Sequence, residues 1–194
     1  MNKYWSKISS NLLPQLPRIN PDIAVESHDL EYLSIKIIKN DQSTTTIKAC
    51  GADLGLRTFL TTFSPSHSIY YQQRQKQIQD NTSIMLLHTI IINHMFDLND
   101  TVFIGSLRLN NFNDFLKINL FNKSLLDIAS KRNKNVLLIP EPYTTKTCSR
   151  CGYLNNIGSS KIYKCRGCNI IACRDLNAAK NILIKGLMVD KSWK

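Results

Sequence analysis

Four of the six cysteines in this chain stand in two pairs with the spacing of metal ligands. Cys148 and Cys151 form the first C-x2-C pair, Cys165 and Cys168 form the second, and thirteen residues separate the two pairs. Four thiolates at this spacing can surround one tetrahedral ion while two short hairpins carry them, so the pattern predicts a zinc ribbon. Cys173 has no partner at the same spacing, and we do not count it among the ligands.

Three acidic residues stand at the ends of predicted elements, and Asp53 among them is a candidate metal ligand. Asp53 ends an apolar run rich in β-formers, Glu141 follows another apolar run, and Asp175 opens a helical pattern. A carboxylate at the end of a buried strand is costly unless it is paired or binds metal, and the rims of α/β sheets gather such groups. Simpler interpretations stay open, because Asp53 could be a turn residue and Asp175 a helix cap. Glu141 could form a surface ion pair with Lys146 or Arg174.

Positive charge is concentrated in the last third of the chain. Residues 1–130 carry 12 basic and 11 acidic side chains, whereas residues 131–194 carry 13 basic and 3 acidic ones, so nearly all of the net charge of +11 lies there. Basic side chains displace the counterions of a phosphate backbone and aromatic rings stack on bases, so the pattern predicts a DNA- or RNA-binding surface. A plain solvated face is the alternative. The candidate phosphate contacts are Lys146, Arg150, Lys161, Lys164 and Arg166, interleaved with Tyr143, Tyr153 and Tyr163.

Hydrophobic periodicity predicts strands and helices around the cysteine segment. Strands are expected over residues 30–38, 46–53, 57–63, 101–107 and 136–139. The pattern turns helical from Tyr70, keeps helical spacing through Met95, and becomes helical again over residues 113–131. A last helix is expected over residues 176–185, where Gly186 would end it. Because a helix followed by a buried strand implies a covered sheet, we expect an α/β fold with a mixed sheet flanked by helices.

The sequence also predicts a soluble protein of a reducing intracellular compartment. Its first residues have no apolar core of the length that a signal peptide needs. The most apolar run, residues 84–96, is interrupted by polar residues and is too short to span a bilayer, so no membrane partner is expected. Paired cysteines in such a compartment hold metal more often than they form disulfides.

Three motifs resemble one family of nucleases. Residues 51–59 read GADLGLRTF, residues 141–152 read EPYTTKTCSRCG, and residues 174–182 read RDLNAAKNI. Together they resemble the RuvC-like nuclease and zinc ribbon of the transposon-encoded TnpB proteins and of their eukaryotic and viral relatives, called Fanzor. The resemblance implies an RNase H-like fold with the ribbon inserted before the last helix. It also implies a magnesium-dependent DNA endonuclease directed by a guide RNA, in which Asp53, Glu141 and Asp175 bind Mg²⁺.

The sequence departs from most bacterial relatives at the second carboxylate. Those relatives carry it in an apolar-Glu-Asp-Leu stretch, and the matching residues 104–107 have Gly105 instead. Fanzor-type relatives place a glutamate directly before the Tyr-Thr-x-Lys-Thr-Cys run, where Glu141 stands. The part before Asp53 is also short for a lobe that binds RNA and recognises a target. The alternative function is therefore a catalytically inactive nucleic-acid-binding module with a zinc ribbon.

The resemblance divides the chain into four parts. Residues 1–44 would be an N-terminal segment, residues 45–143 the first part of the RuvC-like domain, residues 144–172 the ribbon, and residues 173–194 the final helix and tail. The location implied is the nucleus or a viral factory for a eukaryotic or viral protein, and otherwise the cytoplasm.

Overall fold

The computed structural model describes residues 26–29, 33–39, 48–55, 58–73, 81–106 and 112–189 of the 194-residue chain. Within these ranges seven strands form one sheet and two form a separate hairpin. The sheet strands are β1 (Glu26–Asp29), β2 (Leu33–Lys39), β3 (Ala49–Leu54), β4 (Leu60–Phe63), β5 (His67–Gln73), β6 (Thr101–Ser106) and β7 (Asn135–Pro140). The helices are α2 (Asn81–Leu98), α3 (Phe112–Lys131) and α4 (Arg174–Val189), and the hairpin consists of β8 (Ile162–Lys164) and β9 (Ile171–Cys173).

The sheet is mixed, as the sequence predicted. Its strand order is β1-β2-β5-β4-β3-β6-β7. The pairs from β1 to β3 are antiparallel, whereas β6 and β7 run parallel to β3. Parallel neighbours need a crossover, and α3 supplies the one between β6 and β7. β3 is therefore bordered by an antiparallel strand on one side and a parallel strand on the other.

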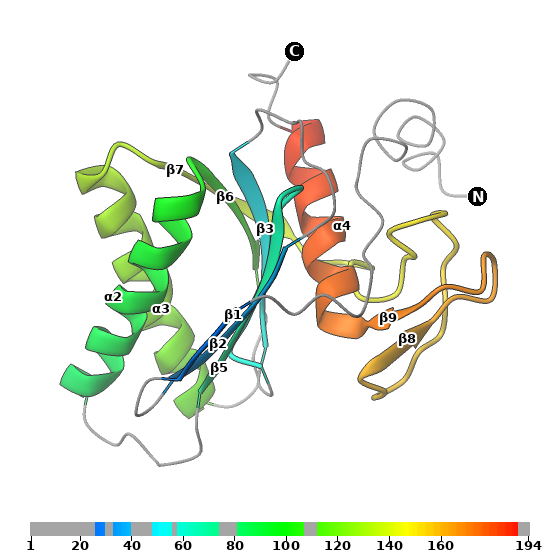
Figure 1. The fold of residues 1–194 in the computed structure, drawn as a ribbon, viewed down its shortest axis with the longest axis horizontal. Coiled ribbons are helices and arrows are strands. Elements are labelled where there is room, and N and C mark those ends of the chain that lie inside the picture. The colour runs from blue at the N-terminus through cyan, green and yellow to red at the C-terminus, as the bar shows by residue number, and fades with distance from the viewer. Residues whose placement is uncertain are drawn as a thin grey trace.

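Helices cover both faces of the sheet, with α2 and α3 on one side and α4 on the other (Figure 1). Successive side chains of β3 point to opposite faces of the sheet, as in any pleated strand, and so pack against the two helical layers alternately. Cys50 and Ala52 belong to the core cluster with α2 and α3, whereas Ala49 packs with the buried residues of α4. Asp53 follows the same alternation as Ala49 and so faces the α4 side.

The expectation that the chain turns helical at Tyr70 is wrong. Residues His67–Gln73 form β5, which pairs with β4 on one side and β2 on the other. Ile69 and Tyr71 are fully buried and alternate along the strand, so pairing on both edges outweighs the helical preference of the glutamines that follow. The rest of the predicted polar helix, residues 74–80, lies outside the described residues.

The last helix is longer than its sequence predicted. It begins at Arg174, places Asp175 in its first turn and continues through Gly186 to Val189. Gly186 is buried, and a Cβ atom there would overlap the ring of Phe103 on β6. The glycine therefore allows α4 to approach the sheet closely and does not end the helix.

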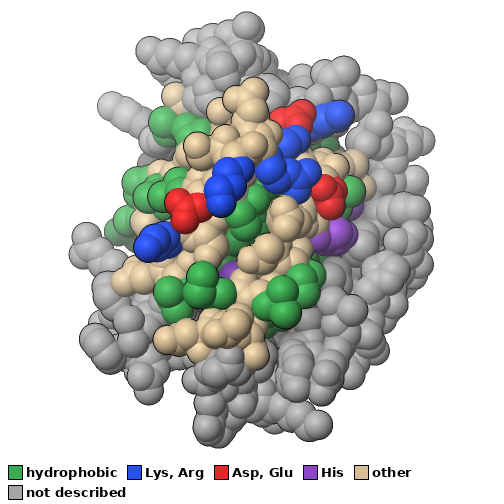
Figure 2. Space-filling model, turned by 90° about the vertical axis from the view of Figure 1, so that its left-hand side faces the viewer, with side chains coloured by type: hydrophobic (Ala, Val, Ile, Leu, Met, Phe, Trp, Pro, Cys, Tyr) green, Lys and Arg blue, Asp and Glu red, His purple; other side chains and the backbone are tan. Residues whose placement is uncertain are grey.

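The outer side of α2 and α3 carries charges of both signs (Figure 2). Arg132 forms an ion pair with Asp97, with 2.7 Å between Nη2 and Oδ1. Met85 and Leu86 of α2 are also exposed. Still, no helix in the described ranges combines the length and the apolar character that crossing a bilayer requires.

Candidate functional site

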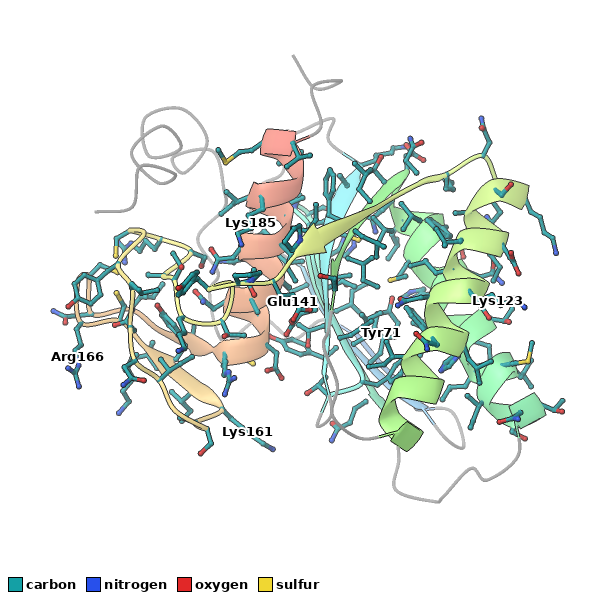
Figure 3. The ribbon with its side chains drawn as sticks, turned by 180° about the vertical axis from the view of Figure 1, so that it is seen from behind. Tyr71, Lys123, Glu141, Lys161, Arg166 and Lys185 are labelled. Carbon is teal, nitrogen blue, oxygen red and sulfur yellow. The ribbon has the colours of Figure 1, made fainter. Side chains whose placement is uncertain are left out.

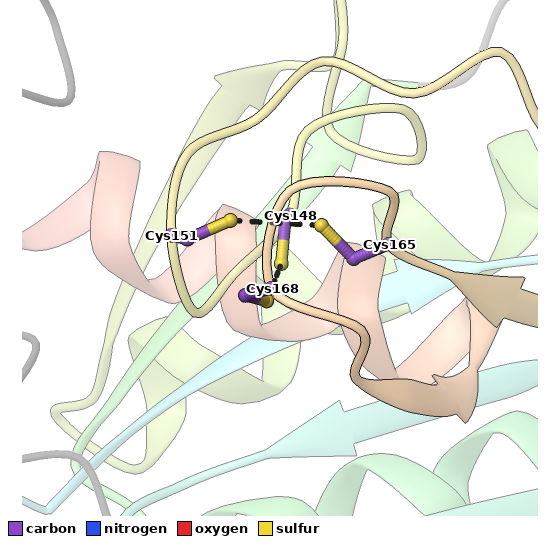
Figure 4. A group of neighbouring side chains, drawn as sticks. All are labelled: Cys148, Cys151, Cys165 and Cys168. Carbon is purple, nitrogen blue, oxygen red and sulfur yellow. Dashed lines mark hydrogen bonds between the residues drawn. The ribbon is translucent and has the colours of Figure 1, made fainter.

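Four sulfur atoms gather where the two cysteine pairs meet (Figure 4). The Sγ atoms of Cys148, Cys151, Cys165 and Cys168 all lie within 4.8 Å of one another. Cys148 and Cys168 are 3.7 Å apart at their sulfurs, and Cys151 and Cys165 are 3.5 Å apart. Around a tetrahedral Zn²⁺ with bonds of about 2.3 Å, neighbouring sulfurs are about 3.8 Å apart. The predicted cysteines therefore form a group that could hold a metal ion such as zinc, and Cys173 lies outside this group.

Hydrogen-bond donors around Cys165 favour its thiolate form. Burial opposes that form, but the Asn155 amide and the N–H groups of Cys168 and Gly167 favour it, and the pKa of Cys165 falls to about 7. Asn155 is itself buried, and its Oδ1 accepts the Arg166 N–H at 2.9 Å. Sequence reasoning missed Asn155, because a single asparagine in a polar loop carries no spacing signal.

The three predicted carboxylates come from three different elements. Asp53 lies within β3, opposite Thr61 of β4, and is 8% exposed, so it is a buried strand residue and not a turn residue. Glu141 directly follows β7, and Asp175 stands in the first turn of α4. The chain thus brings acidic groups from β3, β7 and α4 to the α4 side of the sheet.

The side chain of Glu141 occupies the space above Gly105. A Cβ atom at Gly105 would overlap Oε1 of Glu141 and lie 3.0 Å from its Cγ. Gly105 follows Ile104, which pairs with Ala52 on β3, so Gly105 stands beside Asp53 on the neighbouring strand. Figure 3 shows Glu141 at the end of β7 near α4. Glu141 therefore places a carboxylate where a side chain at Gly105 would otherwise project.

Burial makes Asp53 and Glu141 costly to ionise, and repulsion by neighbouring carboxylates adds to the cost for Asp53. Burial is the main cause of an Asp53 pKa well above the usual range, the charges of Asp175 and Glu141 add to it, and Arg174 offsets part of it. Burial also raises the pKa of Glu141, and Lys185 offsets part of that rise. Oε1 of Glu141 is buried and has no hydrogen-bond partner among the described residues. Carboxylates in such surroundings are suited to taking up a proton or a cation.

The carboxylates are nevertheless spread more widely than the thiolates. Within the part of the chain that the structure describes, the four cysteines alone form a group of three or more His, Cys, Asp or Glu residues with closely gathered ligand atoms. Asp175 and Glu141 act electrostatically on Asp53, but the three carboxylates do not meet that condition. A cation shared by such a set would be held partly through water, as Mg²⁺ in proteins commonly is.

The predicted nucleic-acid contacts lie at the surface of the ribbon. Figure 3 shows Lys161 and Arg166 pointing outward. The exposed fractions of Tyr143 and Tyr153 are 58% and 48%. Tyr163 is fully buried and donates its hydroxyl to a backbone carbonyl at 3.1 Å, so it is not available to stack on a base. The exposed basic set is Lys146, Arg150, Lys161, Lys164 and Arg166.

A polar stripe on α4, formed by Asn177, Asn181 and Lys185, was not assigned a role from the sequence. These side chains stand four residues apart and bind backbone atoms between Pro140 and Ser149. Their spacing on one face of an amphipathic helix is the signal that could have revealed them.

Comparison with known proteins finds one family model and several viral relatives that match parts of this chain. A family model described as Cas12f1-like, TNB domain, matches residues 120–182. The putative transposase R186 of Acanthamoeba polyphaga mimivirus is 53% identical over 68 residues, which cover 35% of this chain and 14% of that protein. The TnpB-like protein L79 of the same virus is 30% identical over 202 residues, which cover 75% of this chain and 38% of that protein. The chain thus spans well under half the length of these relatives.

A solved structure shares the fold. The cryo-EM structure of a Cas12f1–sgRNA–target DNA complex matches with a TM-score of 0.54 and 17% identity, over 77% of this chain and 55% of that chain. This similarity confirms the predicted RNase H-like, RuvC-type α/β fold. The family match spans Glu141, the four cysteines and the first half of α4, which carry two of the three motifs. The motifs, the fold and the viral TnpB-like relatives agree, and this chain belongs to the TnpB/Fanzor-like family.

Proposed function

We propose that this chain carries the catalytic centre of a Mg²⁺-dependent DNA endonuclease, formed by Asp53, Glu141 and Asp175. The observation that supports this most strongly is the carboxylate of Glu141, which lies over Gly105, the residue beside Asp53 on the neighbouring strand. The residue types fit the ion, because Mg²⁺ prefers oxygen ligands. A bound cation would also relieve the raised pKa of Asp53 and would give the buried Oε1 of Glu141 a partner.

Each carboxylate has a distinct part in this proposal. Asp53 provides the fixed ligand, because it is held within a strand that pairs on both sides. Glu141 and Asp175 approach from β7 and α4 and complete the set. When bound there, Mg²⁺ would activate the attacking water and stabilise the leaving oxygen of a phosphodiester.

A structural zinc ion held by the four cysteines is the second part of the proposal. Four thiolates select a softer ion than carboxylates do, so the two sites should not compete. The sulfur separations of 3.5 and 3.7 Å fit zinc. The ion would supply the ribbon with folding free energy.

DNA is the proposed substrate, and a guide RNA is the proposed partner of the whole protein. The exposed basic residues of the ribbon support binding to a phosphate backbone. The Cas12f1 structure that shares this fold contains an sgRNA and a target DNA. For this chain, target recognition by the RNA is a proposal drawn from that relationship.

The test is DNA cleavage by the zinc-loaded chain with and without Mg²⁺. We expect cleavage only with Mg²⁺, and a loss on the order of 10³-fold in Glu141→Ala, because removing one ligand costs several kcal/mol of transition-state stabilisation. Zinc content should be unchanged in this variant. Asp127→Ala is the matched control, because Asp127 is an exposed acidic residue of α3, on the far side of the sheet.

A catalytically inactive binding module is the second candidate, favoured by the wide spread of the carboxylates and by the exposed basic surface. It predicts nucleic-acid affinity that falls steeply between about 50 and 200 mM salt, because bound counterions are released. Equal binding by wild type and Glu141→Ala, together with no Mg²⁺-dependent cleavage by wild type, would favour this module over the nuclease.

A further inference from the structure

The three backbone carbonyls around Glu141 all accept hydrogen bonds. Pro140 and Pro142 have no N–H group, so Glu141 carries the only backbone N–H of this three-residue segment. Lys185 Nζ donates to the Pro140 carbonyl at 3.2 Å and to the Pro142 carbonyl at 2.8 Å. The Glu141 carbonyl between them accepts both the N–H and the hydroxyl of Thr144, each at 2.9 Å. Three successive carbonyls are therefore satisfied, and two of them by one lysine.

The rest of the polar stripe on α4 fixes the other end of the same connection. Asn181 Nδ2 donates to the carbonyls of Thr144 and Thr147, both at 2.7 Å. Asn177 donates to the Thr147 carbonyl at 2.8 Å and accepts the Ser149 N–H at 2.9 Å. The helix that carries Asp175 thus also holds the segment from Pro140 to the first zinc-ligand cysteine. Of the three stripe residues, only Lys185 contacts the backbone on both sides of Glu141.

We propose that Lys185 is a positioning residue for Glu141, which holds the carboxylate over Gly105 and thereby sets the divalent-cation affinity of the Asp53–Glu141–Asp175 site. The inference rests on the proposed nuclease function. Lys185 does not reach the reacting atoms in this proposal, because its ammonium is bound to backbone carbonyls.

The surroundings of Lys185 strengthen this role. Burial lowers the pKa of Lys185 and the nearby Glu141 offsets part of this shift, so the lysine is partly withdrawn from water and close to that carboxylate. Charge-assisted hydrogen bonds are stronger in such partly desolvated places. Figure 3 shows Lys185 on α4 close to Glu141. Without the ammonium, the Pro140 and Pro142 carbonyls would lose their partner, and Glu141 would lose the positive charge that offsets part of the rise in its pKa.

The test measures Mn²⁺ binding to the zinc-loaded full chain by electron paramagnetic resonance, which needs no cleavage. We expect Lys185→Met to weaken Mn²⁺ binding by about 10-fold or more, the range for residues that orient metal ligands. Lys185→Arg keeps donors for the two carbonyls and should recover most of the affinity. Zinc content should stay the same in both variants. Lys123→Met is the matched control, because Lys123 is an exposed lysine on α3, on the far side of the sheet (Figure 3).

Two outcomes separate this inference from the function on which it rests. If Glu141→Ala weakens Mn²⁺ binding and Lys185→Met does not, the positioning role is overturned and the metal site stands. If wild type shows no Mn²⁺ binding that depends on Glu141, the proposed function falls and the inference falls with it. Lys185→Gln keeps an amide donor group without the positive charge, and so guards against a folding defect. Loss of zinc or of the thermal transition in both the Met and Gln variants would show a purely structural lysine and overturn the proposal.

Discussion

The two ligand sets of this chain are supported in opposite ways. The four cysteines lie on loops of the ribbon, where the buried cluster consists of Cys148, Tyr163 and Cys165 with a few partly buried neighbours. The three carboxylates stand on β3, on α4 and just after β7, beside a large apolar core. The thiolates are gathered closely, whereas the carboxylates are spread more widely, and burial makes Asp53 and Glu141 costly to ionise.

In the ribbon, metal binding is needed to form the structure around the site. In the sheet, the fold positions the carboxylates without a metal ion. A cluster as small as that of the ribbon cannot supply enough apolar burial to fold alone, so ion binding there is coupled to folding. The sheet, by contrast, holds Asp53 in place regardless of any ion, and folding must overcome the desolvation of its charge. Loss of a ligand should therefore destabilise the ribbon, whereas loss of a carboxylate should stabilise the sheet.

Zinc removal should have the largest effect and should be confined to one region. A strong chelator, or Cys148→Ser combined with Cys165→Ser, removes a contribution of about 10 kcal/mol to ribbon folding. We expect rapid amide hydrogen exchange in the ribbon and continued protection in β3 and β6, measured by mass spectrometry. Cys173→Ser is the control and should keep its zinc, because Cys173 lies outside the sulfur cluster. If zinc removal also abolished the protection of the sheet amides from exchange, in one cooperative step, the ribbon and the sheet would not differ in their dependence on metal.

Crowding Glu141 should affect only the carboxylate site. In Gly105→Ala the added Cβ overlaps Oε1 of Glu141, so the carboxylate must move. Displacement of a reacting geometry by about 1 Å costs on the order of 10²-fold in rate, and we expect a loss of that size in DNA cleavage with zinc retained. The double variant Gly105→Glu with Glu141→Gly returns a carboxylate to the same place from β6. It should be more active than either single variant, and activity no higher than theirs would refute the idea that the two positions serve one site.

Neutralising Asp53 should have a smaller effect, and its direction depends on pH. Because the pKa of Asp53 is raised in the folded state, the folded chain holds its proton more tightly than the unfolded chain does. The contribution of Asp53 to the free energy of unfolding is fully present below its pKa in the unfolded chain, about 4. This contribution declines as the pH rises toward the pKa of Asp53 in the folded chain. Asp53→Asn should therefore raise the melting temperature of the Mg²⁺-free, zinc-loaded protein at pH 8, by about 2–4 °C for each kcal/mol regained.

Thermal melts at pH 5 and pH 8 check this sign. The gain of Asp53→Asn over wild type should be larger at pH 8, and added Mg²⁺ should stabilise wild type more than the variant. If Asp53→Asn destabilised the protein equally at both pH values, the Asp53 carboxylate would contribute structural hydrogen bonds and not an unpaired charge that a cation can bind.

Local patterns in the sequence were sufficient for the ribbon and for most of the elements. The C-x2-C spacing predicted the sulfur cluster correctly, because the geometry of each pair depends on residues only three apart. The amphipathic stripe of α3 and the apolar run of β7 also became a helix and a strand, but β7 is an edge strand with Leu138 exposed and not the buried strand that was predicted. The same reasoning failed at Tyr70 and Gly186, where pairing with β2 and β4 and the approach of α4 to Phe103 outweigh local preference.

The sequence by itself determined which residues could bind metal: four cysteines at ligand spacing and three acidic residues beside strands and a helix. Only the tertiary structure decided how the acidic residues are arranged. The carboxylate of Glu141 reaches Gly105 because β6 and β7 pair in parallel, and its backbone is held because α4 packs across the sheet and presents Lys185. These contacts join residues far apart in the chain, and no local spacing encodes the register of two strands or the distance of a helix from a sheet.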